Sequence, residues 1–563
     1  MPDMKTPQPL RVNRVDLAER CIEAVELSWA AGRITGIKSL GPARADWPYL
    51  IPGFVDAHVH IESSLLPPAE FARLAVRHGT VASVSDPHEI ANVLGLAGVR
   101  WMLANAAQTP FHILFGAPSC VPATAFETAG AHLGVAEVSE LLATPGIGYL
   151  SEVMNFPGVL AGDASLLAMI KAAQARGLPV DGHAPGLCGA AAAAYAQAGI
   201  STDHECSTLA EAEDKLAAGM RILIREGSAA RNFDALHPLL TSHPGRVMLC
   251  TDDCHPDDLA RGHINHLAAR AVALGHDVFD VLQAACLTPQ EHYGLALGQL
   301  RVGDPFNAAL LDNLRDFNVL ACWLDGQLAA EAGQSCLPQA ACTPVNRFAA
   351  QRICATSLQL AASPGQLSRV IVAEDGQLLT REIHLPVSGP DVPADVLLIA
   401  VLNRYAPARP AVALVRGFGL REGAFASSIA HDSHNIIGVG CDAASLAQAI
   451  NAVIASQGGL ALVDGGGQVD SLPLPIAGLM SDQPGETVAA RYAALSSAVR
   501  QRLGSPLRAP YMSLSFMALL VIPELKLSDR GLFDGRDFTF VELEYASLTP
   551  GKSPLAACTE VAK

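Results

Sequence analysis

The stretch PGFVDAHVH occupies residues 52–60, within an apolar run that begins at Tyr49. Alternate side chains of a strand lie on the same face, so we expect His58 and His60 to point together from the end of a buried strand. Two imidazoles presented in this way commonly bind one metal ion. A histidine pair on an exposed strand edge is the alternative, and the rest of the chain favours the metal site.

This stretch is the first of eight short apolar runs, each followed by an Ala/Leu-rich stretch of helical period. Several helical stretches end in the usual stop residue, at Gly79, Gly177, Gly199 and Gly219. This alternation predicts an α/β fold, a (β/α)8 TIM-like barrel. An open doubly wound sheet is the alternative, but no GxGxxG follows the first strand. The eight runs are 51–60, 80–88, 111–119, 147–154, 178–183, 199–205, 220–227 and 246–253.

Polar residues stand at the end of nearly every run, and active sites of such barrels lie at the carboxyl ends of the strands. Any one of these residues could be a core residue or a helix cap. Their shared position favours a metal centre, because burying so many unpartnered imidazoles and carboxylates is costly. In chain order they are His58 and His60, Asp86, His88 and Glu89, Ser119, Glu152, His183, His204 and Glu205, Arg225 and Glu226, and Asp252 and Asp253.

The nitrogen and oxygen donors among them suit Fe(II), Mn(II) or Zn(II) better than a thiolate site would. Their number exceeds what one tetrahedral ion with an open position needs. Glu152 is well placed to bridge two ions, and Asp252 could both ligate and accept a proton from an activated water. The candidate ligands are His58, His60, Glu152, His183, His204 and Asp252.

The composition excludes several other classes of protein. A chain of 563 residues predicts two or three domains, and 50% hydrophobic against 17% charged residues excludes a disordered chain. A net charge of −17 argues against nucleic acid as a partner. We find no signal peptide and no apolar run near the roughly 20 residues of a membrane helix. Thirteen cysteines without a CxxC pair indicate reduced thiols and a cytoplasmic protein.

The longer motifs resemble the bacterial adenine deaminase family of the amidohydrolase superfamily. The superfamily pattern, which many hydrolases share, is HxH on the first strand, single histidines on the fifth and sixth strands, and aspartate on the eighth. DPHE, IREGSAARN and HDSHN are far more specific, and the resemblance runs from about residue 50 to about residue 540. Segments that resemble the family include PGFVDAHVHIESS (52–64), DPHEIANVLG (86–95), IREGSAARN (224–232) and SIAHDSHNIIGVG (428–440).

The resemblance implies hydrolytic deamination of adenine to hypoxanthine and ammonia, with a metal-activated hydroxide attacking purine C6. It implies two divalent ions per chain, Mn(II) or Fe(II), with Zn(II) as a further candidate. The six ligands would be those named above. Glu152 stands where the superfamily often has a carboxylated lysine as the bridge. The expected partner is a small molecule, adenine, with no nucleic acid or membrane, and we expect a homo-oligomer, a dimer or tetramer.

Such a reaction needs groups that protonate a ring nitrogen and the leaving amine. Our candidates are Asp252 and Glu89, with His88 as a second; a helix cap at His88 and Glu89 is the alternative. Ser119 and Glu226 could hydrogen-bond purine edges. Arg225 and Arg231 could instead pair with Glu226 or nearby carboxylates and be structural.

The flanks of the barrel predict two further units. By resemblance, 1–50 and 300–345 build one small β-domain, with its turn at AAGRITGI (30–37), although we do not expect the first 20 residues to be ordered. The barrel is expected over 51–299, and the change to alternating apolar strands indicates a separate α+β domain over 346–563. There, His434 or His431 of HDSHN could close over the barrel mouth and touch substrate; a polar turn is the alternative.

Two other hypotheses remain open at this point. The first is an amidohydrolase that acts on another aminopurine or on a cyclic amide, since the rim residues would be the same. The second is a metal-binding scaffold without catalysis, although a scaffold has no need of six ligand-type residues at strand ends.

Overall fold

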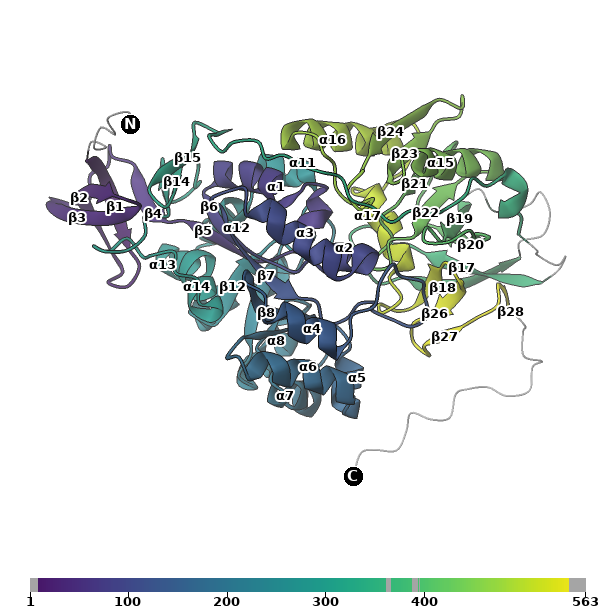
Figure 1. The fold of residues 1–563 in the computed structure, drawn as a ribbon, viewed down its shortest axis with the longest axis horizontal. Helices are drawn as coiled ribbons and strands as arrows, with labels where there is room; N and C mark the ends of the chain where they lie inside the picture. Colours follow the sequence, from purple (N-terminus) through teal and green to yellow (C-terminus); the bar gives the residue numbers. More distant parts are fainter. Residues whose placement is uncertain (1–8, 361–365, 387–392, 394, 546–563) are drawn as a thin grey trace.

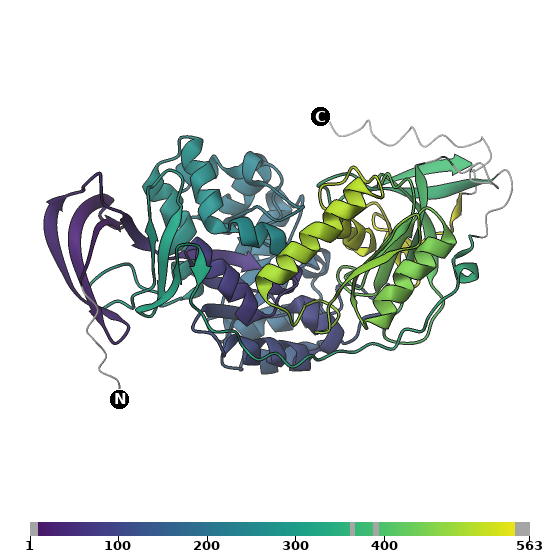
Figure 2. The same ribbon diagram turned by 90° about the horizontal axis from the view of Figure 1, so that it is seen from above.

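The computed structural model describes residues 9–360, 366–386, 393 and 395–545. Three β-containing regions follow one another along the longest axis of the molecule (Figure 1). A mixed sheet lies at one end, a unit of parallel strands and helices lies in the middle, and a larger mixed sheet lies at the other end. The view from above shows the same order (Figure 2).

Each of the eight predicted runs contains one strand of the middle unit, and all neighbouring strands there are parallel. The ladders form two sheets, of order β5-β6-β7-β8-β9 and β10-β11-β12. The strands are β5 (Phe54–Val59), β6 (Thr80–Ser85), β7 (His112–Ala117), β8 (Ile147–Val153), β9 (Val180–Gly182), β10 (Thr202–Asp203), β11 (Arg221–Arg225) and β12 (Val247–Cys250).

Backbone hydrogen bonds join these two sheets at both edges. Ser201 donates its N–H to the Val180 carbonyl, 2.8 Å away, which connects the β9 and β10 sides. Asp252 donates to the His58 carbonyl over 2.9 Å, which brings the chain after β12 back to β5. Side chains from strands around this unit pack into one buried cluster that includes Ala57, Val84, Tyr149, Leu223 and Met248.

Helices follow the strands as the glycine stops predict. Positive φ angles, between 69° and 114°, occur at all four glycines that we expected to end helices: Gly79, Gly177, Gly199 and Gly219. Residues with a Cβ rarely adopt such backbone angles. The helices of this unit are α1 (Pro68–Ala75), α2 (His88–Leu94), α3 (Leu96–Ala106), α4 (Val135–Leu141), α5 (Phe156–Ala161), α6 (Ala164–Gln174), α7 (Gly189–Gln197), α8 (Leu209–Ala217), α9 (Phe233–Leu236), α10 (Leu239–Ser242), α11 (Pro256–Arg261), α12 (Ile264–Ala273), α13 (Val278–Leu282) and α14 (Thr288–Tyr293).

The first run, predicted as one strand, is two strands in different sheets. β4 (Tyr49–Pro52) pairs with β1 and β13 of the end sheet, and only β5 belongs to the middle unit. Gly53 alone separates them, because Pro52 is the last residue of β4. A Cβ on Gly53 would lie 2.2 Å from a methyl group of Val81, so the chain changes sheets where only glycine fits.

The end sheet interleaves strands from both flanks of the middle unit, in the order β16-β15-β14-β13-β4-β1-β2-β3. Our expectation that the first 20 residues are not ordered is wrong from Leu10 onward, because Val12 and Val15 on the first strand of this sheet are fully buried. Residues 1–8 lie outside the described residues. The other strands are β1 (Leu10–Asp16), β2 (Cys21–Ala30), β3 (Arg33–Pro42), β13 (Ala308–Leu311), β14 (Val319–Leu324), β15 (Gln327–Glu331) and β16 (Gln334–Ser335).

The described part of the C-terminal region is β-rich and contains three α-helices, α15 (Ala443–Ala455), α16 (Gly485–Gln501) and α17 (Pro510–Ser515). Its main sheet runs β18-β17-β20-β19-β22-β21-β23-β24, with β28 (Glu544–Tyr545) paired to β17, and a small sheet is formed by β25, β26 and β27. The strands are β17 (Leu367–Val372), β18 (Arg381–Pro386), β19 (Val396–Leu402), β20 (Ala411–Arg416), β21 (Ala424–Ser427), β22 (Ile436–Gly440), β23 (Gly459–Val463), β24 (Val469–Pro473), β25 (Leu525–Ser528), β26 (Gly531–Asp534) and β27 (Thr539–Phe540).

The C-terminal region packs against the strand ends of the middle unit. The long loop after β7 reaches into it: Phe126 contacts the Phe533 ring, and Asn435 donates to the Thr128 carbonyl over 2.9 Å. α16 packs on α11 from the other side. Among the described residues, no helix combines the length and the apolar character that a membrane span requires.

Candidate active site

His58 and His60 converge on one carboxylate, as their spacing predicts. The Nε2 atom of His58 lies 3.5 Å, and that of His60 3.1 Å, from the same oxygen of Asp252, Oδ1. Asp252 follows β12 with a φ of 56°, in the left-handed region that aspartate tolerates better than most residues. Its backbone bonds to the His58 carbonyl and the His60 N–H hold the three side chains in register.

Glu152, on β8, lies between two groups of histidines. Its Oε2 atom is 2.8 Å from Nδ1 of His183 and 3.2 Å from Nε2 of His204, while its Oε1 atom is 3.4 Å from Nε2 of His60. Burial alone would raise the pKa of Glu152, but His183 and His204 lower that pKa well below its ordinary value. One carboxylate therefore faces both groups in its charged form.

These residues fit a metal centre on two observations. His58 is fully buried, and neither of its ring nitrogens has a hydrogen-bond partner, which is costly unless an ion uses them. Donor atoms 3.1 to 3.5 Å apart also have the spacing of adjacent ligands about 2.1 Å from one ion. Among the described residues, three compact groups of donor atoms contain Glu152 or Asp252: His60 with Asp86, His88 and Glu152; His58 with His204 and Asp252; and Glu152 with His183 and His204.

Arg225 is part of this cluster, not a surface group. Its guanidinium forms an ion pair with Glu205 and donates to Oδ2 of Asp252 over 2.7 Å. Burial would raise the pKa of Asp252, but Arg225 and the histidines lower it well below its usual range. Arg225 therefore holds the oxygen of Asp252 that does not face His58 and His60.

Glu89 stands in the first turn of α2 with its carboxylate turned to the pocket. His431 of the C-terminal region lies 3.0 Å from its Oε1 atom, and His434 contacts its Oε2 atom. Burial would raise the pKa of Glu89, but His431 and His434 lower it well below its ordinary value. Other carboxylates accept from the N–H groups at the start of α2: Asp86 from that of His88 and Glu62 from that of Ile90, both at 3.1 Å, so capping does not explain Glu89.

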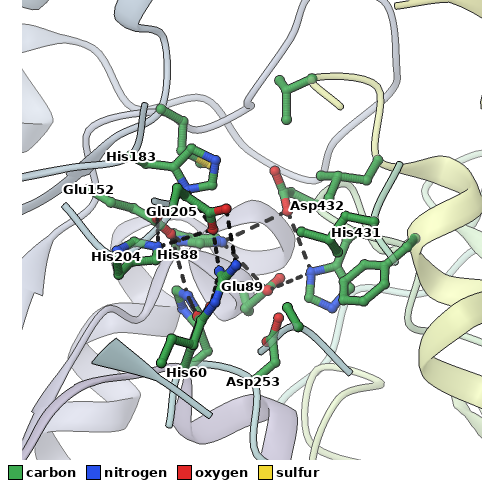
Figure 3. A pocket seen from close by; sticks show the side chains of 18 residues that line it. His60, His88, Glu89, Glu152, His183, His204, Glu205, Asp253, His431 and Asp432 are labelled. Carbon is green, nitrogen blue, oxygen red and sulfur yellow. Dashed lines mark hydrogen bonds and ion pairs between the residues drawn. The ribbon is translucent and has the colours of Figure 1, made fainter. Parts of the chain in front are cut away.

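Figure 3 shows the two sides of the resulting pocket, with His431 and Asp432 facing the histidines and carboxylates of the strand ends. The HDSHN segment therefore reaches the site. The cavity measures about 40 Å³, and the apolar side chains of Leu378, Phe516 and Leu519 also line it. Polar groups form the floor, and a largely apolar roof comes from the C-terminal region.

Three residues with predicted substrate roles do not line this pocket. Ser119 is buried and donates its hydroxyl to the Glu152 carbonyl over 2.7 Å, so it supports β8. Glu226 lies outside the pocket and forms ion pairs with Arg270 at 2.8 Å and with Arg231 at 3.7 Å. Glu226 and Arg231 therefore form the structural ion pair that the sequence offered as the alternative to substrate binding. His434 contacts Glu89 from behind, and its neighbour His431 takes the pocket position.

His88 is held in the site by Asp86, a strand-end residue for which the sequence predicted no specific contact. Asp86 accepts from Nδ1 of His88 over 2.9 Å and orients the ring. Sequence reasoning also missed the pairing of Glu205 with Arg225, and it missed Asp432, for which the HDSHN motif was the available signal. Nothing in the local sequence of Leu378 or Phe516 indicated a place in the pocket roof.

The comparisons with known proteins agree with this geometry. The amidohydrolase family model matches residues 49–329, which defines the class of protein. The adenine deaminase C-terminal domain matches residues 373–539, the part of the chain that supplies the roof.

The chain is 54% identical to an adenine deaminase of Salinibacter ruber over 94% of this chain and 97% of that protein. It is 52% identical to an adenine deaminase of Sulfurovum sp. over 95% of this chain and 99% of that protein. The chain belongs to the adenine deaminase family, and the resemblance inferred from its motifs is confirmed. A solved N-acetyl-D-glucosamine-6-phosphate deacetylase of Mycobacterium smegmatis, 17% identical with a TM-score of 0.43, covers 57% of this chain and all of that one, a likeness too low to carry an argument.

Proposed function

We propose that this protein hydrolyses adenine to hypoxanthine and ammonia in the pocket between the strand ends and the C-terminal region. The observation that carries the proposal is the position of Glu152 and Glu89 in one buried pocket of a chain from the adenine deaminase family. Glu152 faces two groups of histidines, and Glu89 faces the space beside them. The pocket thus holds both ligand-type carboxylates and a proton-handling carboxylate outside the ligand set, Glu89, and hydrolysis at an aromatic ring uses both kinds of group.

The two parallel sheets, in this proposal, act as one (β/α)8 barrel over 51–299. The backbone bonds of Ser201 to Val180 and of Asp252 to His58 at the two edges support this. The end sheet, from 1–50 and 300–345, and the C-terminal region, 346–563, would be two further domains. The first supports the barrel, and the second closes its mouth.

Two divalent ions would be held by His58, His60, Glu152, His183, His204 and Asp252, with Glu152 common to both. Mn(II) and Fe(II) are the proposed ions and Zn(II) a further candidate, because the donors are nitrogen and oxygen only. When bound, such ions lower the pKa of a water and polarise the group under attack. The orphaned nitrogens of His58 support this assignment.

The reaction forms a C–O bond at purine C6 and breaks the C–N bond, so protons must move from water to the ring and to the leaving amine. Asp252 is placed to accept a proton of the attacking water. Glu89, charged in the free protein, is placed to accept a proton and pass it to a ring nitrogen. His88, oriented by Asp86 and 3.5 Å from Glu89, would help to return a proton to the amine.

The roof would exclude bulk water and cover the flat face of the base. Phe516 and Leu378 offer apolar contact to an aromatic ring, while Glu205 and Asp432 stand at the polar edge of the pocket. A buried, largely closed site strengthens the electrostatic interactions among Glu89, Asp252 and the substrate.

The test is ammonia release from adenine, guanine and cytosine, measured side by side on protein stripped of metal and then reloaded with Mn(II) or Fe(II). Activity on adenine that saturates near two metals per chain is the expected result. Metal uptake with activity on another aminopurine or on a cyclic amide would contradict adenine as the substrate. Metal uptake without any turnover would favour a scaffold.

A further inference from the structure

A second cavity of about 350 Å³ lies beside the catalytic pocket. Loops after β9, β10 and β11 form one wall, and residues 376–379, from the turn between β17 and β18, form part of the other. Four residues line both spaces: Glu205, Arg225, Ala230 and Leu378. They are therefore the partition between the inner pocket and this outer cavity.

The inner pocket is too small for its proposed substrate as it stands. About 40 Å³ is room for roughly three water molecules, and a fused purine ring is much larger. Glu205 and Arg225 are held by their ion pair and by Asp252. Leu378 is the one member of the partition that comes from the C-terminal region, on a turn where the neighbouring Leu379 is 55% exposed.

Lys526 holds this turn and the roof together. It is fully buried on β25, and its Nζ atom donates to the Leu378 carbonyl at 2.7 Å and to the Phe516 carbonyl at 3.0 Å. Among the described residues no carboxylate pairs with it, and burial lowers the pKa of Lys526 to about 7. A neutral amine has two N–H groups, one for each carbonyl. An apolar side chain would fill the same space without the cost of burying a cation, so the two donors are what the position uses.

We propose that Lys526 is a positioning residue for the proposed deamination. Its amine sets the distance between Leu378 and Phe516, and thereby the roof over the substrate and the partition from the outer cavity. Thr380 reinforces the same contact, since its hydroxyl donates to the Leu525 carbonyl over 2.9 Å and its N–H to the Pro523 carbonyl over 3.2 Å. The outer cavity is then the approach through which a purine reaches the metal ligands.

The proposal rests on the proposed function and is tested with Lys526→Met in the full-length, metal-loaded protein. Met has a similar length but no donors. We expect the KM for adenine to rise about tenfold while kcat changes less than about threefold, because the roof contributes binding and not proton transfer. Amide hydrogen exchange at 376–380 and 516–519 should become faster, and bound metal should stay the same. Lys526→Arg, which keeps donors, should recover part of the KM.

The matched control is Tyr511→Phe, which removes another buried hydrogen bond to a carbonyl, that of Ala461, from the same region. It should lower stability without changing KM or exchange at 376–380. An unchanged KM and exchange in folded Lys526→Met would overturn the proposal, as would an equal KM rise in Tyr511→Phe. If Lys526→Met does not fold, Leu378→Ala carries the test, and an unchanged KM there rejects it. Hydrogen exchange is measured without turnover. Unchanged exchange therefore rejects the positioning role of Lys526, whereas the absence of ammonia release from adenine in the parent protein rejects adenine as the substrate.

Discussion

Two buried networks of histidine and carboxylate start from the same strand and differ in how their polar atoms are satisfied. Asp56, two residues before His58 on β5, accepts from the Thr251 N–H at 3.0 Å and faces Nε2 of His263 at 3.0 Å. The other nitrogen of His263 lies 2.7 Å from the Thr80 hydroxyl. His58 is equally buried, yet neither of its nitrogens has a partner.

The difference shows which buried polar groups hold the fold and which await a ligand. A satisfied network adds stability, because each donor and acceptor exchanged water for a protein partner. An orphaned imidazole beside carboxylates lowers stability until something binds it. We therefore expect the Asp56 network to govern folding and the His58 cluster to govern activity, and the following experiments test that division.

The largest expected effect is on turnover, from Asp252→Asn. The amide keeps the shape but loses the charge that faces His58, His60 and Arg225, so ammonia release from adenine should fall by roughly a thousandfold or more. Circular dichroism should show an intact fold. Activity within tenfold of the parent would reject Asp252 as part of the machinery.

The second expected effect is on stability, from Asp56→Asn. Loss of the charged acceptor of Thr251 and His263 should lower the free energy of unfolding by about 2 to 4 kcal/mol, measured by urea titration. The kcat per folded molecule should stay within about threefold. A drop in kcat as large as that of Asp252→Asn, without loss of stability, would erase the distinction between the networks.

Metal removal should destabilise the protein through the His58 cluster alone. Ligand binding at a concentration of one hundred times Kd adds about 2.7 kcal/mol to the native state, so a chelator should lower the Tm of the parent by several degrees. Asp252→Asn should show a smaller drop, while Asp56→Asn should show the full one. Equal drops in all three proteins would mean that the ions bind elsewhere.

Lys526 is a third kind of buried group, an amine that donates to two carbonyls without a carboxylate partner among the described residues, and it should make stability depend on pH. The pKa of Lys526 is lowered from 10.5 to about 7 by burial, so between these values the unfolded chain binds more protons than the folded one. Stability must therefore rise with pH. From pH 7 to 8 the parent should gain about 1 kcal/mol relative to Lys526→Met, measured by urea titration at both pH values. A parallel pH dependence in both proteins would show that the lysine does not titrate in this range.

The smallest effect is expected from Glu226→Gln. Because Glu226 pairs with Arg270 and Arg231 outside the pocket, the KM for adenine should change less than about twofold and the stability by about 0 to 1 kcal/mol. A tenfold rise in the KM for adenine in this variant would instead support the predicted role of Glu226 in binding the purine.

The amount that could be predicted differs between the two sides of the pocket. The eight strand runs, the glycine stops and the six candidate ligands were legible, because parallel strands bring their carboxyl ends to one edge whatever the loops do. On the other side, the family-like segments gave a site hypothesis only for HDSHN, which did not show that His431 lines the pocket while His434 contacts Glu89 from behind. Loop conformations depend on packing between distant segments, so spacing in the sequence does not encode them.

By itself, the sequence determined the order of the parallel strands, the type of donor at each strand end and the family to which the chain belongs. Only the tertiary structure decided that Asp56 is satisfied while His58 is not, that Arg225 holds Asp252 while Glu226 turns away, and that Leu378 and Phe516 form a roof held by Lys526. The reason is physical. Strand periodicity is a local property of the chain, whereas hydrogen-bond satisfaction and cavity shape are set by partners on different elements, here 10 to 195 residues apart in the sequence.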